Sequence, residues 1–113
     1  MANDITANGY QQLAQRTSPD GHDRILNGVL GLAGEAGECA DLVKKALFQG
    51  HELDRDHLID ELSDVAWYIA ETATGLGVSL SEILNHNIEK LKRRYPDGFD
   101  PERSIHREEN ENA

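Results

Sequence analysis

The sequence has little of what secreted or membrane-spanning domains contain. It has a single cysteine, Cys39, so no disulfide can form within the chain. No apolar run approaches the roughly 18 residues that a membrane span needs, and residues 1–9 lack the basic start and apolar stretch of a signal peptide. We therefore expect a cytoplasmic protein, in a bacterial cell or in the host of a phage.

Positive charge and aromatic residues are also scarce. Lys and Arg number 11 against 21 Asp and Glu, a formal net charge of -10, so we expect neither nucleic acid nor a membrane as a partner. Aromatics are 5% of the chain, which favours small aliphatic packing. The length of 113 residues predicts a single domain, placed at residues 1–107, with a disordered tail at 108–113. A monomer this short buries a modest share of its surface, so shared burial in an oligomer is expected.

Helical patterns are what the sequence has in abundance. We expect four helices with Pro or Gly at the breaks, over residues 6–16, 23–48, 54–74 and 79–94, followed by a turn-rich charged segment. No strand alternation persists, so the fold class predicted is all-α. The positions expected to face inward are Tyr10, Leu13 and Ala14 in the first helix, Leu32, Cys39, Val43 and Ala46 in the second, and Leu58, Leu62, Val65 and Ile69 in the third.

The second predicted helix carries glycine at every third residue over one stretch. These positions are Gly28, Gly31, Gly34 and Gly37. Each glycine costs about 1 kcal/mol relative to alanine inside a helix. We interpret them as places where a partner helix or a ligand approaches the backbone, and the alternative is a local break of the helix near Gly31.

Two pairs of carboxylates stand three residues apart on consecutive predicted helices. Glu35 and Glu38 form one pair, and Glu61 and Asp64 form the other. Residues at that spacing share a helix face, so packing the apolar stripes together would gather four carboxylates at the edge of the core. Clustered carboxylates repel one another, and a hard divalent cation, Mg²⁺ or its substitute Mn²⁺, relieves the repulsion. The alternative is a solvated acidic surface.

A basic run provides the opposite charge. Four of the 11 basic residues fall within five positions, at Lys90, Lys92, Arg93 and Arg94. Lys and Arg bind phosphate, so together with the carboxylates they suggest a phosphorylated substrate. The alternative is that they complement the dipole at the end of their helix. The chain has no GxxxxGK[ST] loop, which excludes a P-loop enzyme.

Three motifs in this order resemble the MazG-like nucleoside triphosphate pyrophosphohydrolases. They are GLAGEAGE at 31–38, DELSDVAWY at 60–68 and NIEKLKRRYPDGF at 87–99. Gly34 stands where the family pattern has the first Glu of a doublet, a variant that resembles the dCTP pyrophosphatases and leaves four acidic ligands.

The resemblance implies a fold, an activity and a set of site residues. It implies a bundle of four to five helices completed by subunit association, as a homodimer or homotetramer. The implied activity is Mg²⁺-dependent hydrolysis of a (deoxy)nucleoside triphosphate to the monophosphate and pyrophosphate, for nucleotide-pool control or housecleaning. The implied metal ligands are Glu35, Glu38, Glu61 and Asp64, and the implied substrate residues are Tyr68, Asn87, Lys90, Arg93 and Arg94.

These expectations define a mechanism hypothesis and its rivals. Glu35 or Glu38 would accept the proton of the attacking water, and the basic run would neutralise the leaving pyrophosphate. A related reading is a phosphoribosyl-ATP pyrophosphohydrolase. A reading of another class is a non-catalytic helical oligomer that binds nucleotide.

Overall fold

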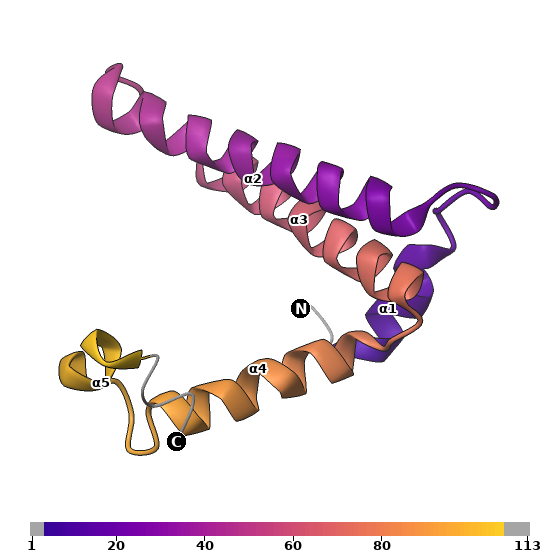
Figure 1. Ribbon diagram of the computed structural model, residues 1–113. Helices are drawn as coiled ribbons and strands as arrows, with labels where there is room; N and C mark the ends of the chain where they lie inside the picture. The colour runs from indigo at the N-terminus through magenta and orange to yellow at the C-terminus, as the bar shows by residue number, and fades with distance from the viewer. Residues whose placement is uncertain (1–3, 108–113) are drawn as a thin grey trace. The chain divides into compact units, whose positions relative to one another are not determined.

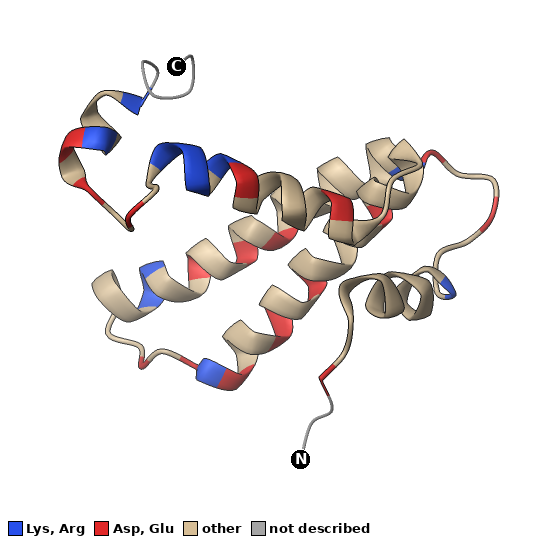
Figure 2. Cartoon of the chain, turned by 90° about the horizontal axis from the view of Figure 1, so that it is seen from below, with Lys and Arg blue, Asp and Glu red and all other residues tan. Residues whose placement is uncertain are grey.

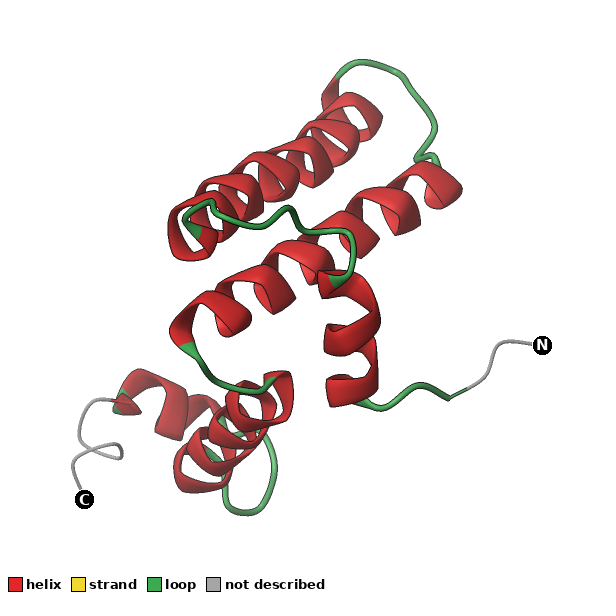
Figure 3. Cartoon of the chain, turned by 90° about the vertical axis from the view of Figure 1, so that its right-hand side faces the viewer, coloured by secondary structure: helices red, strands yellow, loops and turns green. Residues whose placement is uncertain are grey.

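The described part of the chain, residues 4–107 of a computed structural model, consists of helices joined by loops (Figures 1 and 3). In chain order the helices are α1 (Ala7–Gln15), α2 (Arg24–Phe48), α3 (Arg55–Leu76), α4 (Leu80–Arg94) and α5 (Pro101–Ile105). The prediction of an all-α fold is confirmed, whereas the predicted tail at 108–113 lies outside the described residues. The chain divides after Leu80 into two compact units, each described by itself below.

Short polar side chains define where three of the helices begin. Thr6, Asp23 and Asp54 precede α1, α2 and α3, and each side chain accepts a hydrogen bond from the backbone N–H three residues further on. These caps satisfy backbone donors that the first turn of a helix leaves unpaired. Gly77, with φ of 75°, ends α3 in the left-handed conformation that glycine adopts without strain.

Two boundaries differ from the sequence predictions. Helix α3 continues through Gly75 to Leu76 and ends at Gly77. Gly75 provides close packing against α2 and does not end the helix, since a Cβ atom there would lie 2.8 Å from the backbone nitrogen of Ile25. The segment expected to be turn-rich contains the short helix α5. Its N-cap is Asp100 and its first residue is Pro101, a combination that favours helix initiation.

The first unit is built on α2 and α3, which lie side by side (Figures 1 and 3). Gly28 lies so close to α3 that a Cβ there would be 2.9 Å from the backbone nitrogen of Thr72, and Gly31 lies against the ring of Tyr68. Together with Gly75, these glycines form a seam of close backbone approach, which we call the glycine seam. The predicted close approach is confirmed at Gly28 and Gly31. At Gly34 and Gly37 no atom of α3 or of the rest of this chain would lie within 4 Å of an added Cβ, so the close approach to α3 does not extend to them, and approach by a ligand there stays a prediction.

The helix does not break near Gly31, because α2 is continuous from Arg24 to Phe48. Close approach through small residues also explains which positions are buried. In α3 the buried residues are Ala70, Glu71 and Ala73. The expected inward positions Leu13, Val43 and Leu62 are not buried, being 56%, 40% and 52% exposed.

Helix α1 is fastened to α3 and to the segment that follows it by hydrogen bonds. The Gln11 side-chain nitrogen donates to Thr74 Oγ1 at 3.0 Å and to the carbonyl of Val78 at 3.1 Å. The Gln11 side-chain oxygen accepts from the backbone of Leu80 at 2.7 Å. The indole nitrogen of Trp67 donates to Thr17 Oγ1 at 2.9 Å. These contacts fix α1 along one end of α3.

The second unit consists of most of α4 followed by α5. Arg103 donates to the carbonyl of Arg94 at 2.5 Å and to the carbonyl of Arg93 at 3.0 Å, so a guanidinium supplies donors to the carbonyls at the end of α4. The rings of Tyr95 and Phe99 are in contact, with centroids 5.3 Å apart and planes tilted by 40°. Across residues 4–107, no helix has both the length and the apolar character needed to cross a membrane.

Candidate functional site

Three of the four predicted carboxylate ligands come together between α2 and α3. Glu35 projects from α2, and Glu61 and Asp64 project from α3, with one oxygen of each within 4.8 Å of the others. We call this group the carboxylate cluster. The glycine seam explains its position, because Gly31 lies against Tyr68 and Glu35 follows Gly31 by about one helical turn. Acidic residues line both helices (Figure 2).

Burial and the proximity of other carboxylates raise the pKa values of two members of the cluster. The pKa of Glu35 is raised, first by the hydrogen-bonding contact with the Glu61 carboxyl, then by burial and by the charges of Glu61 and Asp60. The pKa of Asp64 is raised by burial first and then by the charges of Glu35 and Asp60. A divalent cation would relieve this repulsion. Three carboxylate groups within reach of one point fit a hard, oxygen-preferring cation such as Mg²⁺ or Mn²⁺.

Glu38 lies outside the carboxylate cluster. It is exposed on α2, about one turn beyond Glu35 and rotated about 60° around the helix axis from it. Its charge acts instead on Lys45, whose pKa is raised mainly by the hydrogen bond to Asp41 and last by the charge of Glu38. The spacing of the pair placed Glu38 on a similar face, but the packed helices bring only Glu35 into the group.

Two residues beside the cluster escaped sequence reasoning. His57 Nε2 lies 3.2 Å from Glu61 Oε1, one turn earlier on α3. Tyr10 on α1 has a raised pKa, caused first by burial and then by the charge of Asp64. The His-Glu spacing of four residues within a predicted helix is a signal that could have revealed His57. The position of Tyr10 depends on how α1 packs, which the sequence pattern does not reveal.

The predicted substrate residue Tyr68 belongs to the first unit. Its ring covers Gly31 on α2 and contacts the ring of Trp67 edge to face, with centroids 5.1 Å apart. Tyr68 follows the cluster residue Asp64 by four positions on α3, so the two side chains lie on the same side of that helix.

The other predicted substrate residues lie on α4 in the second unit. Asn87 and Arg93 are exposed, and Lys90 and Arg94 are half-buried. Figure 2 shows the basic residues gathered on the last turns of this helix. Lys92 pairs with Glu89 at 3.4 Å. Their assignment to substrate stays a prediction.

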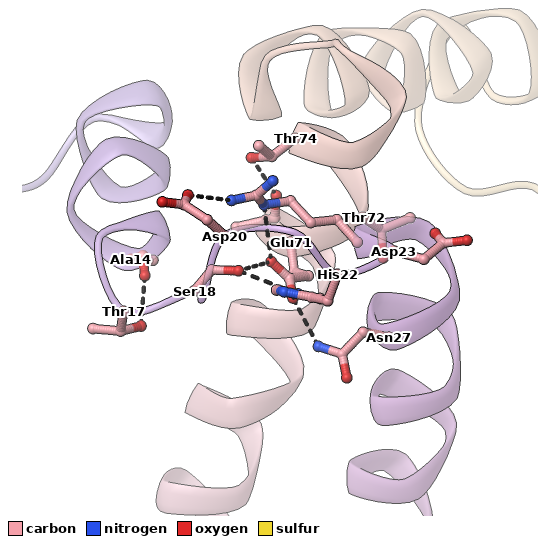
Figure 4. Close-up of polar contacts among 12 residues, drawn as sticks. Ala14, Thr17, Ser18, Asp20, His22, Asp23, Asn27, Glu71, Thr72 and Thr74 are labelled. Atoms are coloured by element: carbon pink, nitrogen blue, oxygen red, sulfur yellow. Dashed lines mark hydrogen bonds and ion pairs between the residues drawn. The ribbon is translucent and has the colours of Figure 1, made fainter.

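Glu71 is a buried carboxylate that the sequence analysis missed (Figure 4). Its side chain has no exposed surface. Ser18 Oγ donates to its Oε1 at 2.7 Å, Asn27 Nδ2 donates to its Oε2 at 2.7 Å, and His22 Nε2 lies 2.8 Å from Oε2. Burial raises its pKa, but the hydrogen bonds from His22, Ser18 and Asn27 outweigh that effect and leave the pKa lowered.

The Ser18-His22-Glu71 arrangement does not form a nucleophilic triad. In such a triad the serine and the carboxylate contact different nitrogens of the imidazole. Here both approach the same nitrogen, Nε2, and the Ser18 hydroxyl donates to Glu71. The group is therefore a polar joint that fastens the segment between α1 and α2 to α3. Ser18, His22 and Asn27 lie 44 to 53 residues before Glu71 in the sequence, which is why local patterns did not reveal the group.

The structure therefore defines an all-α protein that carries an acidic cluster of hard oxygen ligands between two packed helices. The model of the MazG nucleotide pyrophosphohydrolase domain matches residues 25–99, a span that includes all three residues of the cluster. The chain belongs to the MazG family.

A phage protein is also similar to this chain. It is the Gene 37 protein of Mycobacterium phage L5, which is 45% identical over 69 residues, covering 58% of this chain and 60% of the phage protein. The chain thus matches under two thirds of that relative's length. No solved structure matches the chain.

Proposed function

We propose that this protein is a Mg²⁺-dependent nucleoside triphosphate pyrophosphohydrolase that converts a (deoxy)nucleoside triphosphate to the monophosphate and pyrophosphate. The observation that carries the proposal is the carboxylate cluster, with its oxygens within 4.8 Å of one another, inside the span that matches the MazG domain. The pKa of Glu35 is raised first by its hydrogen-bonding contact with Glu61, and that of Asp64 first by burial. Neighbouring negative charges raise both further, which supports the proposal because a divalent cation would relieve that part.

Glu35, Glu61 and Asp64 are the proposed metal ligands. Bound Mg²⁺ or Mn²⁺ would supply charge stabilisation at the phosphoryl oxygens. A carboxylate engaged as a ligand is a poor proton acceptor, so of the two candidate bases we propose Glu38, which is exposed and outside the cluster. Glu38 would take the proton of the attacking water.

The substrate residues proposed are Tyr68, Asn87, Lys90, Arg93 and Arg94. The amide of Asn87 would donate to the nucleotide, and the cations would offset charge growing on the leaving pyrophosphate. Control of the nucleotide pool or removal of unwanted nucleotides is the proposed role.

Product chromatography over a panel of substrates tests the proposal. The protein is incubated with Mg²⁺ and canonical or modified nucleoside triphosphates in ribose and deoxyribose forms, with phosphoribosyl-ATP included. We expect monophosphate and pyrophosphate from one or a few triphosphates. Glu61→Gln should reduce turnover by at least about 100-fold, while its helix content by circular dichroism stays unchanged.

The rival functions give different results in the same experiment. Turnover of phosphoribosyl-ATP alone would show that the substrate class is wrong. Nucleotide binding measured by calorimetry, without product in Mg²⁺ or Mn²⁺, would favour a non-catalytic module and contradict the proposed activity.

A further inference from the structure

His57 contacts the carboxylate cluster from its outer side. Its Nε2 atom lies 3.2 Å from Glu61 Oε1, one helical turn away on α3. The Glu61 side chain is 14% exposed and the His57 side chain is 50% exposed, so the imidazole is the more exposed of the two partners. The backbone N–H of His57 donates to the cap residue Asp54 at 3.0 Å, which fixes the first turn that carries the ring.

This contact commits one of the two Glu61 oxygens. An ionised carboxylate only accepts hydrogen bonds, so Nε2 carries the hydrogen and donates it to Oε1. The Glu61 carboxyl also makes the contact that does most to raise the pKa of Glu35. With Oε1 engaged by His57, Glu61 has its second oxygen available to a cation.

The number of oxygens that a carboxylate offers distinguishes divalent cations. Ca²⁺ takes six to eight oxygen ligands and often binds both oxygens of one carboxylate. Mg²⁺ is smaller, keeps a near-ideal octahedral shell and takes one oxygen from each carboxylate. Residues that hydrogen-bond a ligating side chain from behind orient it and tune metal affinity.

We propose that His57 is a positioning residue that holds Glu61 as a one-oxygen ligand and so favours Mg²⁺ and Mn²⁺ over Ca²⁺ in the carboxylate cluster. The inference rests on the proposed metal site and adds cation selectivity to it. Nothing in the sequence motifs assigns a role to His57.

Calorimetric titration of the 113-residue chain with Mn²⁺ and with Ca²⁺, in the absence of nucleotide, tests this inference. The variants are His57→Ala, which removes the donor, and His57→Gln, whose side-chain amide keeps an N–H at similar reach. His51→Ala, which alters an exposed histidine in the loop before α3, is the matched control.

The expected result is a change in the ratio of the two affinities. His57→Ala should lower the preference for Mn²⁺ over Ca²⁺ by about tenfold. His57→Gln should restore the preference to within about threefold of the parent protein, and His51→Ala should leave it unchanged. A loss of stability alone would weaken both cations together and would not move the ratio.

One result would overturn the inference: an unchanged ratio of the two affinities in His57→Ala, whether both affinities stay at the parent values or fall equally. Glu61→Gln separates this failure from failure of the metal site. If Glu61→Gln still binds Mn²⁺ like the parent protein, the proposed site is wrong. If Glu61→Gln loses Mn²⁺ while His57→Ala keeps the parent ratio, only the role of His57 is wrong.

Discussion

At the residue scale, Glu71 is the largest fully buried side chain among the described residues. Its carboxylate is fully buried and is held by Ser18, His22 and Asn27, with the guanidinium of Arg24 3.7 Å away. A buried charge is tolerated only where hydrogen bonds and opposite charge replace its hydration. The joint therefore stabilises the fold as long as all of its members remain.

Removing the Glu71 carboxylate should destabilise the protein. Glu71→Ala leaves buried donors without an acceptor, and we expect the free energy of unfolding to fall by about 3 kcal/mol or more. Urea unfolding followed by circular dichroism measures this change. Asn85→Ala, on the exposed face of α4, is the control and should shift stability by less than about 0.5 kcal/mol. Equal stability of Glu71→Ala and the parent protein would show that the joint contributes nothing.

The pH dependence of this contribution has a defined sign. The pKa of Glu71 is lowered from 4.5 in the folded state, so the fold favours its ionised form. Its contribution is fully present above the pKa of the unfolded carboxyl, and it is lost as the pH falls through the lower folded value. The stability difference between the parent protein and Glu71→Gln should thus shrink as the pH falls below about 4.5.

The comparison with Glu71→Gln isolates this effect from the carboxylate cluster. Glu35 and Asp64 have raised pKa values, so their contribution has the opposite sign and decreases as the pH rises. Both proteins share that contribution, and it cancels in the difference. A difference that grows as the pH falls below 4.5 would contradict the assigned direction for Glu71.

The sequence alone predicts which side chains share one face of a single helix. Glu61 and Asp64 follow from spacing alone, since residues three apart share a face. Glu71 could not be found in this way, because its partner Ser18 is 53 positions away. Glu38 satisfies the same spacing rule as Glu35 but stays exposed, because spacing fixes direction around one helix and not the position of the neighbouring helix.

At the scale of elements, the glycine seam decides how closely α2 and α3 pack. A Cβ at Gly28 would meet Thr72, including its backbone nitrogen at 2.9 Å, whereas a Cβ at Gly34 would meet open space. The repeated glycines in the sequence predicted a close approach, but their even spacing did not reveal which of them face α3. The periodic apolar pattern predicted the helices well. The packing of α2 against α3 depends instead on small residues, which an apolar pattern does not distinguish.

Two alanine substitutions on α2 should therefore act in opposite directions. Gly28→Ala forces the helices apart and should lower the free energy of unfolding by about 1–3 kcal/mol. Gly34→Ala removes backbone freedom without a clash and should raise it by up to about 1 kcal/mol. Thermal unfolding of the two variants measures both effects. Equal effects of the two substitutions would contradict the seam.

At the scale of the whole molecule, exposed apolar side chains on α2 support the proposed oligomer. Leu26, Val29 and Leu30 are 58%, 50% and 64% exposed. Val29 and Leu30 follow Leu26 by three and four residues, so the three side chains form one apolar strip. Such strips on small proteins mark association surfaces. The proposed homodimer or homotetramer would bury this strip, in keeping with the small core expected from the length of the chain.

Light scattering coupled to size-exclusion chromatography should give a mass that is a multiple of 12.5 kDa. Leu30→Asp should lower the mass toward the monomer, because it places a charge in the strip. Leu13→Asp, at a 56% exposed leucine of α1, is the matched control and should keep the oligomer. A parent protein that elutes as a monomer at all concentrations would contradict the proposal.

The most direct test of the proposed function is the identity of the phosphate product. Phosphorus NMR of a reaction containing Mg²⁺ and the best triphosphate distinguishes cleavage between the α and β phosphates from removal of the terminal phosphate. We predict that the protein releases pyrophosphate and nucleoside monophosphate in equal amounts, and that Glu61→Gln releases neither. Two results would contradict this prediction. One is orthophosphate and nucleoside diphosphate as the first products, and the other is undiminished pyrophosphate release by Glu61→Gln.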